Sequence, residues 1–399
     1  MDPSLIHDPV HHDLIATTLT KEIGNLIPGL VDEIDCCLNK HWGNNSKWKE
    51  VCIAETTQRI LSGVNNRAFI GLPCCRNAPM LQSVIAFAQD LPLSLLILKA
   101  FPSILKPIVA PLITLPKRIH TNSFQSILAP EIKARLEEYD ARNYGIQTTK
   151  SERNDFLQWS IEQAKDDGTS RNWQVGALAQ RILLLNFVAI HTSTFAVTHA
   201  LLDIASSSPD LVKELRLEVK TVLDYHGNQG SKRPLAQMGK LDSAIRESQR
   251  KNTFVAIGVG RVVIAEKGVT FPSGTHVRKG LSVAVPGYSV LQDPEVYPDS
   301  KTYQPLRFYK ARHGIEDDNV KSAREALPTT SQNFLGWGSG RSACPGRFFA
   351  SNEIKTMIAY ISLRYDIEHL PERPRNTWIA QNRIPPMRAT LRIRRKTSD

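Results

Sequence analysis

The sequence lacks a cysteine framework. Its six cysteines include no Cys-x-x-Cys spacing, and four of them form two adjacent pairs, Cys36-Cys37 and Cys74-Cys75. This distribution argues against a set of disulfides and favours a reducing compartment. The first eight residues also lack a charged segment followed by an apolar run, so they predict neither a signal peptide nor an anchor helix.

A long uninterrupted apolar run is missing as well. The most apolar stretch, residues 91–115, contains Lys99, Lys106 and prolines at positions 92, 102, 107 and 111. A membrane-spanning helix needs about 20 mostly apolar residues with few charges. We therefore expect residues 91–115 to be a buried segment or a contact with a membrane surface.

Acidic residues are fewer than basic ones, and the formal net charge is +11. The basic residues are dispersed, apart from residues 392–396, and no aromatic residues alternate with them in a stripe. Nucleic-acid-binding surfaces usually gather their basic residues on one face, so the sequence argues against a nucleic-acid partner. With 41% hydrophobic and 22% charged residues, the 399-residue chain can form a substantial globular core.

The hydrophobic pattern predicts a mainly α fold with small β-sheets. Residues 1–250 have helix-like spacing, 251–290 alternate as short strands, 291–343 are irregular and rich in proline, and 344–399 predict a helix and a C-terminal hairpin. The expected helices are 48–69, 122–139, 151–167, 174–206, 209–227, 235–250 and 345–363; the expected strands are 254–263, 269–271, 276–277 and 281–285, with the hairpin at 379–394.

One cysteine, Cys344, stands apart, since the preceding cysteine is Cys75. It follows Gly338 and Gly340 in a glycine-rich loop, and Gly346 leads into the expected helix. The N-terminus of a helix lowers the pKa of a thiol and stabilises the thiolate. A solitary thiolate in such a loop suits an axial ligand to a haem iron, whereas a buried structural cysteine is the alternative.

The sequence 337–350 closely resembles the haem-binding loop of the cytochrome P-450 superfamily. Its ending, Cys-Pro-Gly-Arg-Phe-Phe-Ala, is similar to the end of this loop in the branch of the family that acts in filamentous-fungal secondary metabolism. The resemblance implies that Cys344 binds the iron of haem b, and that Gly340 and Gly346 shape the loop. Trp337 stands where the family usually has phenylalanine.

The resemblance also implies contacts with the haem propionates. Ser342 stands where the family usually has a basic residue or histidine, which shifts that contact to the neighbouring Arg341. Arg261 lies on the strand where the family supplies a propionate-binding base. An ordinary surface arginine is the alternative for Arg261.

A second motif is Glu247-Ser248-Gln249-Arg250. An acid and an arginine three residues apart share one helix face, and by themselves they form an ordinary surface pair. In its position the motif resembles the family's Glu-x-x-Arg helix, which a later arginine completes. Arg307 matches that arginine, so the resemblance implies a buried Glu247–Arg250–Arg307 network.

His191 and Thr192 lie inside the long apolar helix expected at 174–206. A histidine in the core and a threonine bonded back to its own helix would be an ordinary structural pair. The stretch resembles the family's oxygen-activation groove, in which an acid and a threonine deliver protons to dioxygen. The resemblance implies that His191 replaces the acid and Thr192 supplies the alcohol.

The resemblance covers nearly the whole chain as a single domain, 1–399, and implies a haem-thiolate monooxygenase. Its expected substrate is a small apolar natural product such as a terpenoid or polyketide. Its expected partner is an NADPH–cytochrome reductase, received by a basic face of Arg341, Arg347 and Lys355. The protein is expected to be a monomer at the surface of the endoplasmic reticulum membrane.

The front of the chain departs from the family. Residues 2–12 resemble the lead into a helix that, in relatives, follows a membrane anchor, a proline-rich hinge, the first strands and a substrate-contacting loop. We therefore expect an N-terminally truncated form of the fold, which would be cytoplasmic if the absence of the anchor is genuine. Two alternative functions remain open: an inactive protein that binds haem poorly, and a haem-thiolate isomerase or dehydratase.

Overall fold

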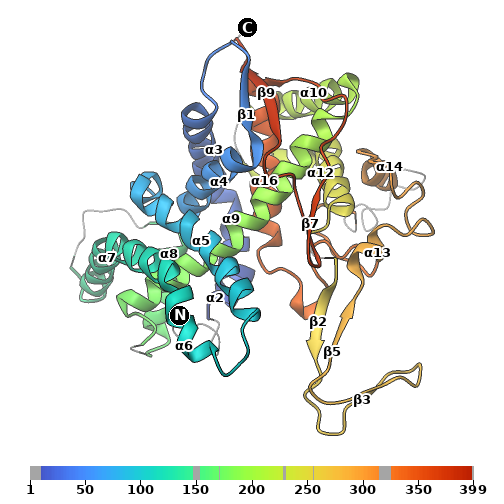
Figure 1. The fold of residues 1–399 in the computed structure, drawn as a ribbon. Helices are drawn as coiled ribbons and strands as arrows, with labels where there is room; N and C mark the ends of the chain where they lie inside the picture. The colour runs from blue at the N-terminus through green and yellow to red at the C-terminus, as the bar shows by residue number, and fades with distance from the viewer. Residues whose placement is uncertain are drawn as a thin grey trace.

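The chain forms a mainly helical body with small antiparallel sheets, some of which extend from it (Figure 1). The computed structural model describes residues 10–146, 153–169, 171–227, 231–254, 256–313 and 325–397. The first nine residues lie outside the described residues, and so do residues 314–324 of the expected irregular stretch. The predominance of helix agrees with the expectation from the hydrophobic pattern.

The expected helices correspond to helices of the structure, with boundaries moved by capping residues and by the length of the apolar pattern. The helices are α2 (Val10–Leu14), α3 (Thr20–His41), α4 (Ile53–Phe69), α5 (Ala78–Lys99), α6 (Lys106–Ile113), α7 (Leu115–Asn143), α8 (Phe156–Asp166), α9 (Val175–Ala205), α10 (Pro209–Tyr225), α11 (Lys232–Gln237), α12 (Gly239–Lys251), α13 (Gly287–Leu291), α14 (Arg307–His313) and α16 (Arg347–Arg364).

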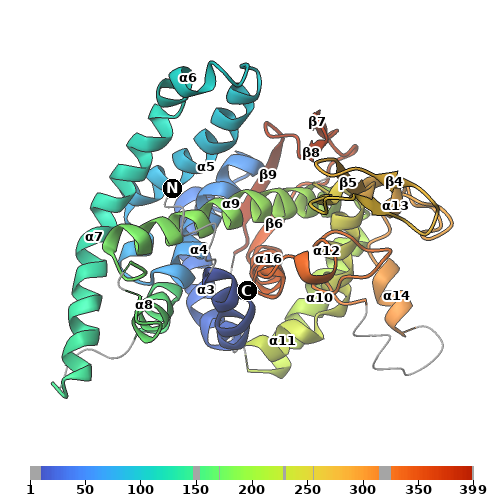
Figure 2. The same cartoon turned by 90° about the horizontal axis from the view of Figure 1, so that it is seen from below.

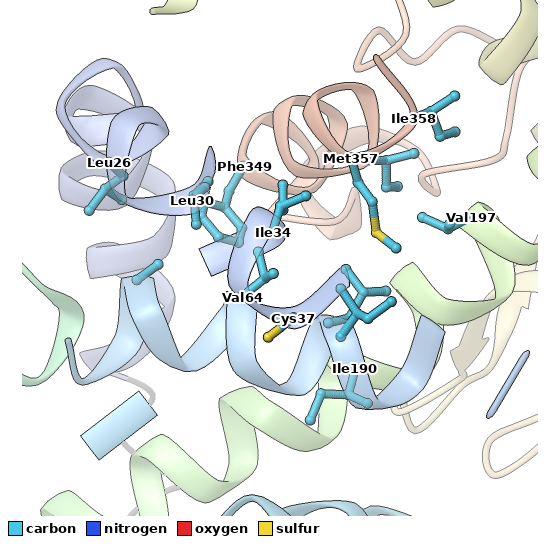
Figure 3. Packing of buried hydrophobic residues seen from close by; sticks show 14 of the residues in the cluster. Leu26, Leu30, Ile34, Cys37, Val64, Ile190, Val197, Phe349, Met357 and Ile358 are labelled. Carbon is cyan, nitrogen blue, oxygen red and sulfur yellow. The ribbon is translucent and has the colours of Figure 1, made fainter. Parts of the chain in front are cut away.

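Helix α9 crosses the middle of the molecule and packs against α4, α5, α7, α12 and α16 (Figure 2). Because neighbours cover most of its surface, it is apolar on nearly every face. Figure 3 shows the core where Ile34 of α3, Val64 of α4, Ile190 of α9 and Met357 of α16 gather. The core therefore holds α16 beside α9, and the loop that carries Cys344 enters α16.

The strand pairing between the early and the late parts of the chain differs from the sequence prediction. Residues 49–52, expected in a helix, form strand β1 (Lys49–Cys52), which pairs with β9 (Thr390–Arg395); β9 also pairs with β6 (Tyr365–Ile367). The hairpin expected at 379–394 is instead the shorter pair of β7 (Thr377–Ile379) and β8 (Asn382–Ile384). Local alternation cannot reveal a partner that lies more than 300 residues away.

The remaining strands occupy the positions expected between residues 251 and 290. Strand β2 (Gly258–Val262) pairs with β5 (Ser282–Val285), and β3 (Val269–Thr270) pairs with β4 (His276–Val277). Gly268 has φ +71°, and an added Cβ would lie 2.5 Å from the carbonyl oxygen of Val277. The turn before β3 therefore requires glycine.

Residues 91–115 form an exposed apolar surface rather than a buried segment. The end of α5, α6 and the start of α7 lie at one edge of the molecule (Figure 2). Ile104, Ile108 and Leu112 are 83%, 70% and 73% exposed. In the described part of the chain, α5 and α9 are long and apolar enough to cross a membrane, but α9 is a core helix. We call Leu93, Leu96, Ile104, Ile108, Leu112 and Ile119 the apolar edge.

Candidate functional site

The loop before α16 presents the thiol of Cys344. The backbone N–H of Cys344 donates to the carbonyl oxygen of Trp337 at 2.7 Å, which closes the loop. The Trp337 indole N–H in turn donates to the Leu327 carbonyl at 2.7 Å. Gly338 has φ +78°, and an added Cβ would lie 3.2 Å from the Ser342 carbonyl oxygen. Glycine is thus required where the loop turns back on itself.

Cys344 lies on the wall of a cavity of about 340 Å³ between α9 and this loop. Its other walls are mainly apolar or small, and Cys344 contributes the only sulfur among the lining residues. Helix α9 contributes Val188, Thr192, Ser193, Phe195, Ala196 and His199; the loop contributes Leu335, Gly336, Trp337 and Gly338; α16 contributes Ala350 and Ile354.

The residues of this cavity fit a haem. A single thiolate is the axial donor that such a cofactor takes in a dioxygen-activating site, and the space between a helix and a glycine loop suits a flat group. One buried donor also faces this region without a partner. The His199 Nδ1 accepts from Arg373 at 2.9 Å, so Nε2 carries the proton, and within the described residues that nitrogen has no hydrogen-bond partner.

The thiol itself does not behave as the sequence predicted. Burial raises the pKa of Cys344 above its ordinary value. The backbone N–H groups of Gly346 and Arg347, together with the Arg347 guanidinium, oppose this rise but do not overcome it. The expectation that the helix N-terminus lowers the pKa is therefore wrong for the free thiol, because desolvation is the larger effect. Coordination to a metal ion deprotonates a thiol outright.

Arg261 of β2 contacts the loop of Cys344 at a residue that does not line the cavity. Its guanidinium donates to the Ser342 hydroxyl at 2.7 Å, so β2 reaches the residue two positions before Cys344. Arg341 is exposed beside it, and Gly340 has φ +60°. Gly346 caps α16, and its Cα faces Ile15, since an added Cβ would lie 3.7 Å from that side chain. The structure thus brings Arg261 against Ser342, the chain neighbour of Arg341.

The three members of the expected charged network are in contact. Glu247 accepts two hydrogen bonds from Arg250, both at 2.8 Å, and its two oxygens share the Nε–H of Arg307, each at 3.2 Å. Glu247 and Arg250 are fully buried. Glu247 also accepts from the backbone N–H of Gln304 at 3.1 Å. Arg250 continues to the carbonyls of Leu291 and Ser300 at 2.6 and 2.8 Å, so the network holds the stretch after β5 against α12.

The basic face expected for a reductase is smaller than predicted. Lys355 is buried, and it pairs with the carboxylate of Asp242 on α12, which also binds Arg312. Burial acts to raise the pKa of Asp242, but the two cations hold it below its ordinary value. The assignment of Lys355 to the surface was wrong because the sequence around it does not show that α12 carries a buried acid opposite. Arg341 is exposed and Arg347 is half-buried.

His191 and Thr192 are separated in their contacts. The His191 Nε2 pairs with the carbonyl oxygen of Ala88 on α5 at 2.7 Å, and burial lowers its pKa. Thr192 lines the cavity, and its hydroxyl donates to the Val188 carbonyl of its own helix at 2.8 Å. The structure therefore places the alcohol at the cavity and engages the imidazole with a neighbouring helix.

The sequence analysis did not identify two buried polar groups of the site, Glu353 and His199. Ser193 donates to the carboxyl of Glu353 on α16 at 3.0 Å, and His199 accepts from Arg373. Arg373 also pairs with the buried Asp203. Glu353 could have been found from the sequence, because it is an acid on the apolar side of the helix expected at 345–363. A buried acid needs a hydrogen-bonding partner.

Comparisons with known proteins agree over most of the chain. The Cytochrome P450 family model matches residues 8–387. Cytochrome P450 monooxygenase 71 of Postia placenta is 37% identical over 389 residues, which cover 96% of this chain and 74% of that protein. Cytochrome P450 monooxygenase gloP of Glarea lozoyensis is 30% identical over 399 residues, 97% of this chain and 73% of that one. Retinoic acid bound cyanobacterial CYP120A1 has the same fold, with a TM-score of 0.70 at 20% identity over 98% of this chain and 78% of its own.

Proposed function

This chain belongs to the cytochrome P450 family, and on that premise we propose that it oxidises a small apolar natural product, such as a terpenoid or polyketide, with Cys344 as the iron ligand. As a member of the family it is a haem-thiolate monooxygenase, and it uses a redox partner and a small-molecule substrate. The observation that carries the proposal is the single thiol on the wall of an apolar cavity beneath α9.

The residues around the cavity would contact different parts of the haem. Cys344 would hold the iron, Trp337 and Ala350 would pack against the ring, and Arg261 with Arg341 would pair with its carboxylates. When bound, a haem held by this thiolate would supply electron density that favours cleavage of the O–O bond of dioxygen.

Helix α9 forms the opposite wall, where a substrate would lie. Val188, Phe195 and Ala196 exclude water and offer apolar contact, which favours an apolar substrate. The Thr192 hydroxyl can turn from the Val188 carbonyl to donate a proton or a hydrogen bond into the cavity. His191 supports this wall by fixing α9 to α5 through Ala88.

We propose that an NADPH–cytochrome reductase docks over the loop of Cys344. Arg341 is exposed there, and Arg347 lies at the same helix start, where its guanidinium donates to the Cys344 carbonyl at 2.9 Å. Two cations on the side of the thiolate favour an acidic partner surface. No nucleic acid is proposed as a partner, and the protein is proposed to act as a monomer.

Incorporation of labelled oxygen separates a monooxygenase from an isomerase or dehydratase. With haem-loaded protein, reductase, NADPH and ¹⁸O₂, we expect one labelled atom in the product and the other in water. Mass spectrometry of the product measures this, with ¹⁸O-labelled water and ordinary dioxygen as the control. Product formed without label from dioxygen would favour the isomerase, and no turnover of any apolar substrate would favour the inactive alternative.

The apolar edge is proposed to rest on the membrane of the endoplasmic reticulum. Its exposed leucines and isoleucines lie beside Lys99, Lys106 and Lys117, a combination that suits an anionic lipid surface. Water would be displaced from side chains that no part of the described chain covers.

Vesicle binding tests this edge. Replacing Ile104, Ile108 and Leu112 together by serine should weaken binding to anionic phospholipid vesicles roughly 100-fold, since each buried aliphatic side chain contributes about 1 kcal/mol or more. Co-sedimentation with the vesicles measures the change. Leu217→Ser on α10 is the matched control, because Leu217 is 65% exposed and lies outside the edge. Equal binding by the triple variant and the wild type would contradict the proposal.

A further inference from the structure

A carboxyl group is buried behind the cavity wall. Glu353 of α16 has no exposed surface, and its one hydrogen-bond partner among the described residues is the Ser193 hydroxyl, at 3.0 Å. The second carboxyl oxygen, Oε1, has no partner in the same described set. Ser193 itself lines the cavity, one residue after Thr192. A hydroxyl thus connects the cavity to an acid inside the protein.

Charged groups of α3, α9, α10 and α12, which pack on α16, are engaged elsewhere, and the cations of α11, Lys232 and Arg233, are exposed. Glu33 of α3 binds Arg76, Asp35 of the same helix binds Tyr360, and Arg216 of α10 binds Asp366. On α9, His199 and Asp203 bind Arg373; on α12, Asp242 binds Lys355 and Glu247 binds Arg250. No cation therefore neutralises Glu353 within the described chain. Burial raises the pKa of Glu353 to about 8, and the bond from Ser193 opposes the rise only in part.

The arrangement contrasts with the relay expected from the sequence. His191 is bonded to the Ala88 carbonyl, and it is absent from the residues that line the cavity. Burial favours the protonated form of Glu353, and its carboxyl accepts from a hydroxyl that faces the cavity. A neutral acid can hold a proton in an apolar interior without the cost of a buried charge.

We infer that Glu353 is a proton store for the cavity, and that it exchanges protons through the hydroxyl of Ser193. This inference rests on the proposed monooxygenase function, in which dioxygen reduction consumes protons. Glu353 does not contact the cavity itself, so its role is to supply Ser193.

The exchange balances in two linked transfers. The Ser193 O–H bond breaks as its proton moves to a basic oxygen in the cavity, and the Glu353 O–H bond breaks as its proton passes to the Ser193 oxygen. Glu353 is left as a carboxylate that accepts from the renewed hydroxyl. Water that enters the open cavity carries a proton from the bulk solvent to Ser193, and the reverse transfers restore the protonated Glu353 and leave the water neutral. The store is therefore filled when the cavity is wet, and it is available when a substrate has displaced the water.

Infrared spectroscopy tests the store without turnover. Between about pH 6 and pH 10, difference spectra of the haem-loaded full chain should show a carboxylic acid C=O signal that is lost with a midpoint near 8. Glu353→Gln should lack this signal. Ser193→Ala should move its midpoint upward, because the hydroxyl favours the carboxylate. Glu218→Gln on α10, a carboxyl bonded to backbone N–H groups, is the control and should leave the signal in place.

The proton supply is tested by measuring how much of the NADPH consumed in the reconstituted system leads to product. Glu353→Gln and Ser193→Ala should each lower product formed per NADPH, up to the roughly 100-fold effect of a positioned acid, with more hydrogen peroxide released. Ser193→Ala is the milder variant if Glu353→Gln loses haem. A missing infrared signal, or wild-type coupling and pH profile in both variants, would overturn the inference. Failure of the monooxygenase proposal would instead appear as unlabelled product, with the infrared result unchanged.

Discussion

Replacement of Cys344 by alanine is expected to abolish the thiolate-type Soret band of the reduced, carbon monoxide-treated protein. Among the cavity-lining residues Cys344 supplies the only sulfur, so no second thiolate can take its place. Loss of the ligand should also reduce activity below detection, since electron donation from the thiolate favours O–O cleavage. The measurement is the ferrous–carbon monoxide difference spectrum of purified protein loaded with haem.

Cys74→Ala provides a matched control, because Cys74 is a half-buried thiol outside the cavity. This variant should keep the band and the haem content of the wild type. Cys344→Ser separates ligation from folding, because it keeps the size of the side chain but offers a harder oxygen donor. A thiolate-type band that persists in Cys344→Ala, or that is absent from the wild type, would refute the assignment of Cys344.

The sequence could reveal the residues whose roles depend on local chain geometry. The loop from Trp337 to Gly346 is contiguous, and its glycines are needed for a turn that brings Cys344 N–H to the Trp337 carbonyl. Glu247 and Arg250 share a helix face by their spacing alone. Their third partner, Arg307, came from the resemblance, because a contact 60 residues away leaves no local trace.

Residues that depend on tertiary packing could not be predicted in the same way. Lys355 looks like a surface cation until α12 brings Asp242 beside it. His191 precedes Thr192 directly, but its imidazole is bonded to the Ala88 carbonyl of α5, and of the two only Thr192 lines the cavity. Strand β1 was hidden for a related reason, since its pairing with β9 is decided by Leu391 and Ile393 entering the core.

The buried charged network should respond most strongly to a change that leaves one partner uncompensated. Glu247→Gln keeps the shape of the side chain but removes the carboxylate that binds both Arg250 and Arg307. Arg250 is fully buried, so its charge would remain without a counter-ion. We expect a loss of roughly 3–5 kcal/mol in the free energy of unfolding, which is the usual cost of breaking a buried ion pair from one side.

The same network holds the stretch before the haem loop in place, so the Glu247→Gln change should also weaken haem binding. Arg250 and Arg307 hold the carbonyls of Ser300 and Pro298, and release of these contacts should lower haem content in the Glu247→Gln protein. Urea unfolding gives the stability change, and the Soret absorbance per chain gives the haem content. Arg307→Ala should cost less than Glu247→Gln, because Arg307 is 12% exposed and its loss leaves the Glu247–Arg250 pair intact.

Arg59→Ala is the control for the network, since its pair with Glu55 lies on the surface and should change stability by less than about 0.5 kcal/mol. The double variant Glu247→Gln/Arg250→Gln should cost less than the sum of the two single changes, because the second removes the charge that the first leaves unpaired. Additive costs would mean that the two side chains do not act as a pair. A Glu247→Gln protein as stable and as haem-loaded as the wild type would show that the network does not hold the loop.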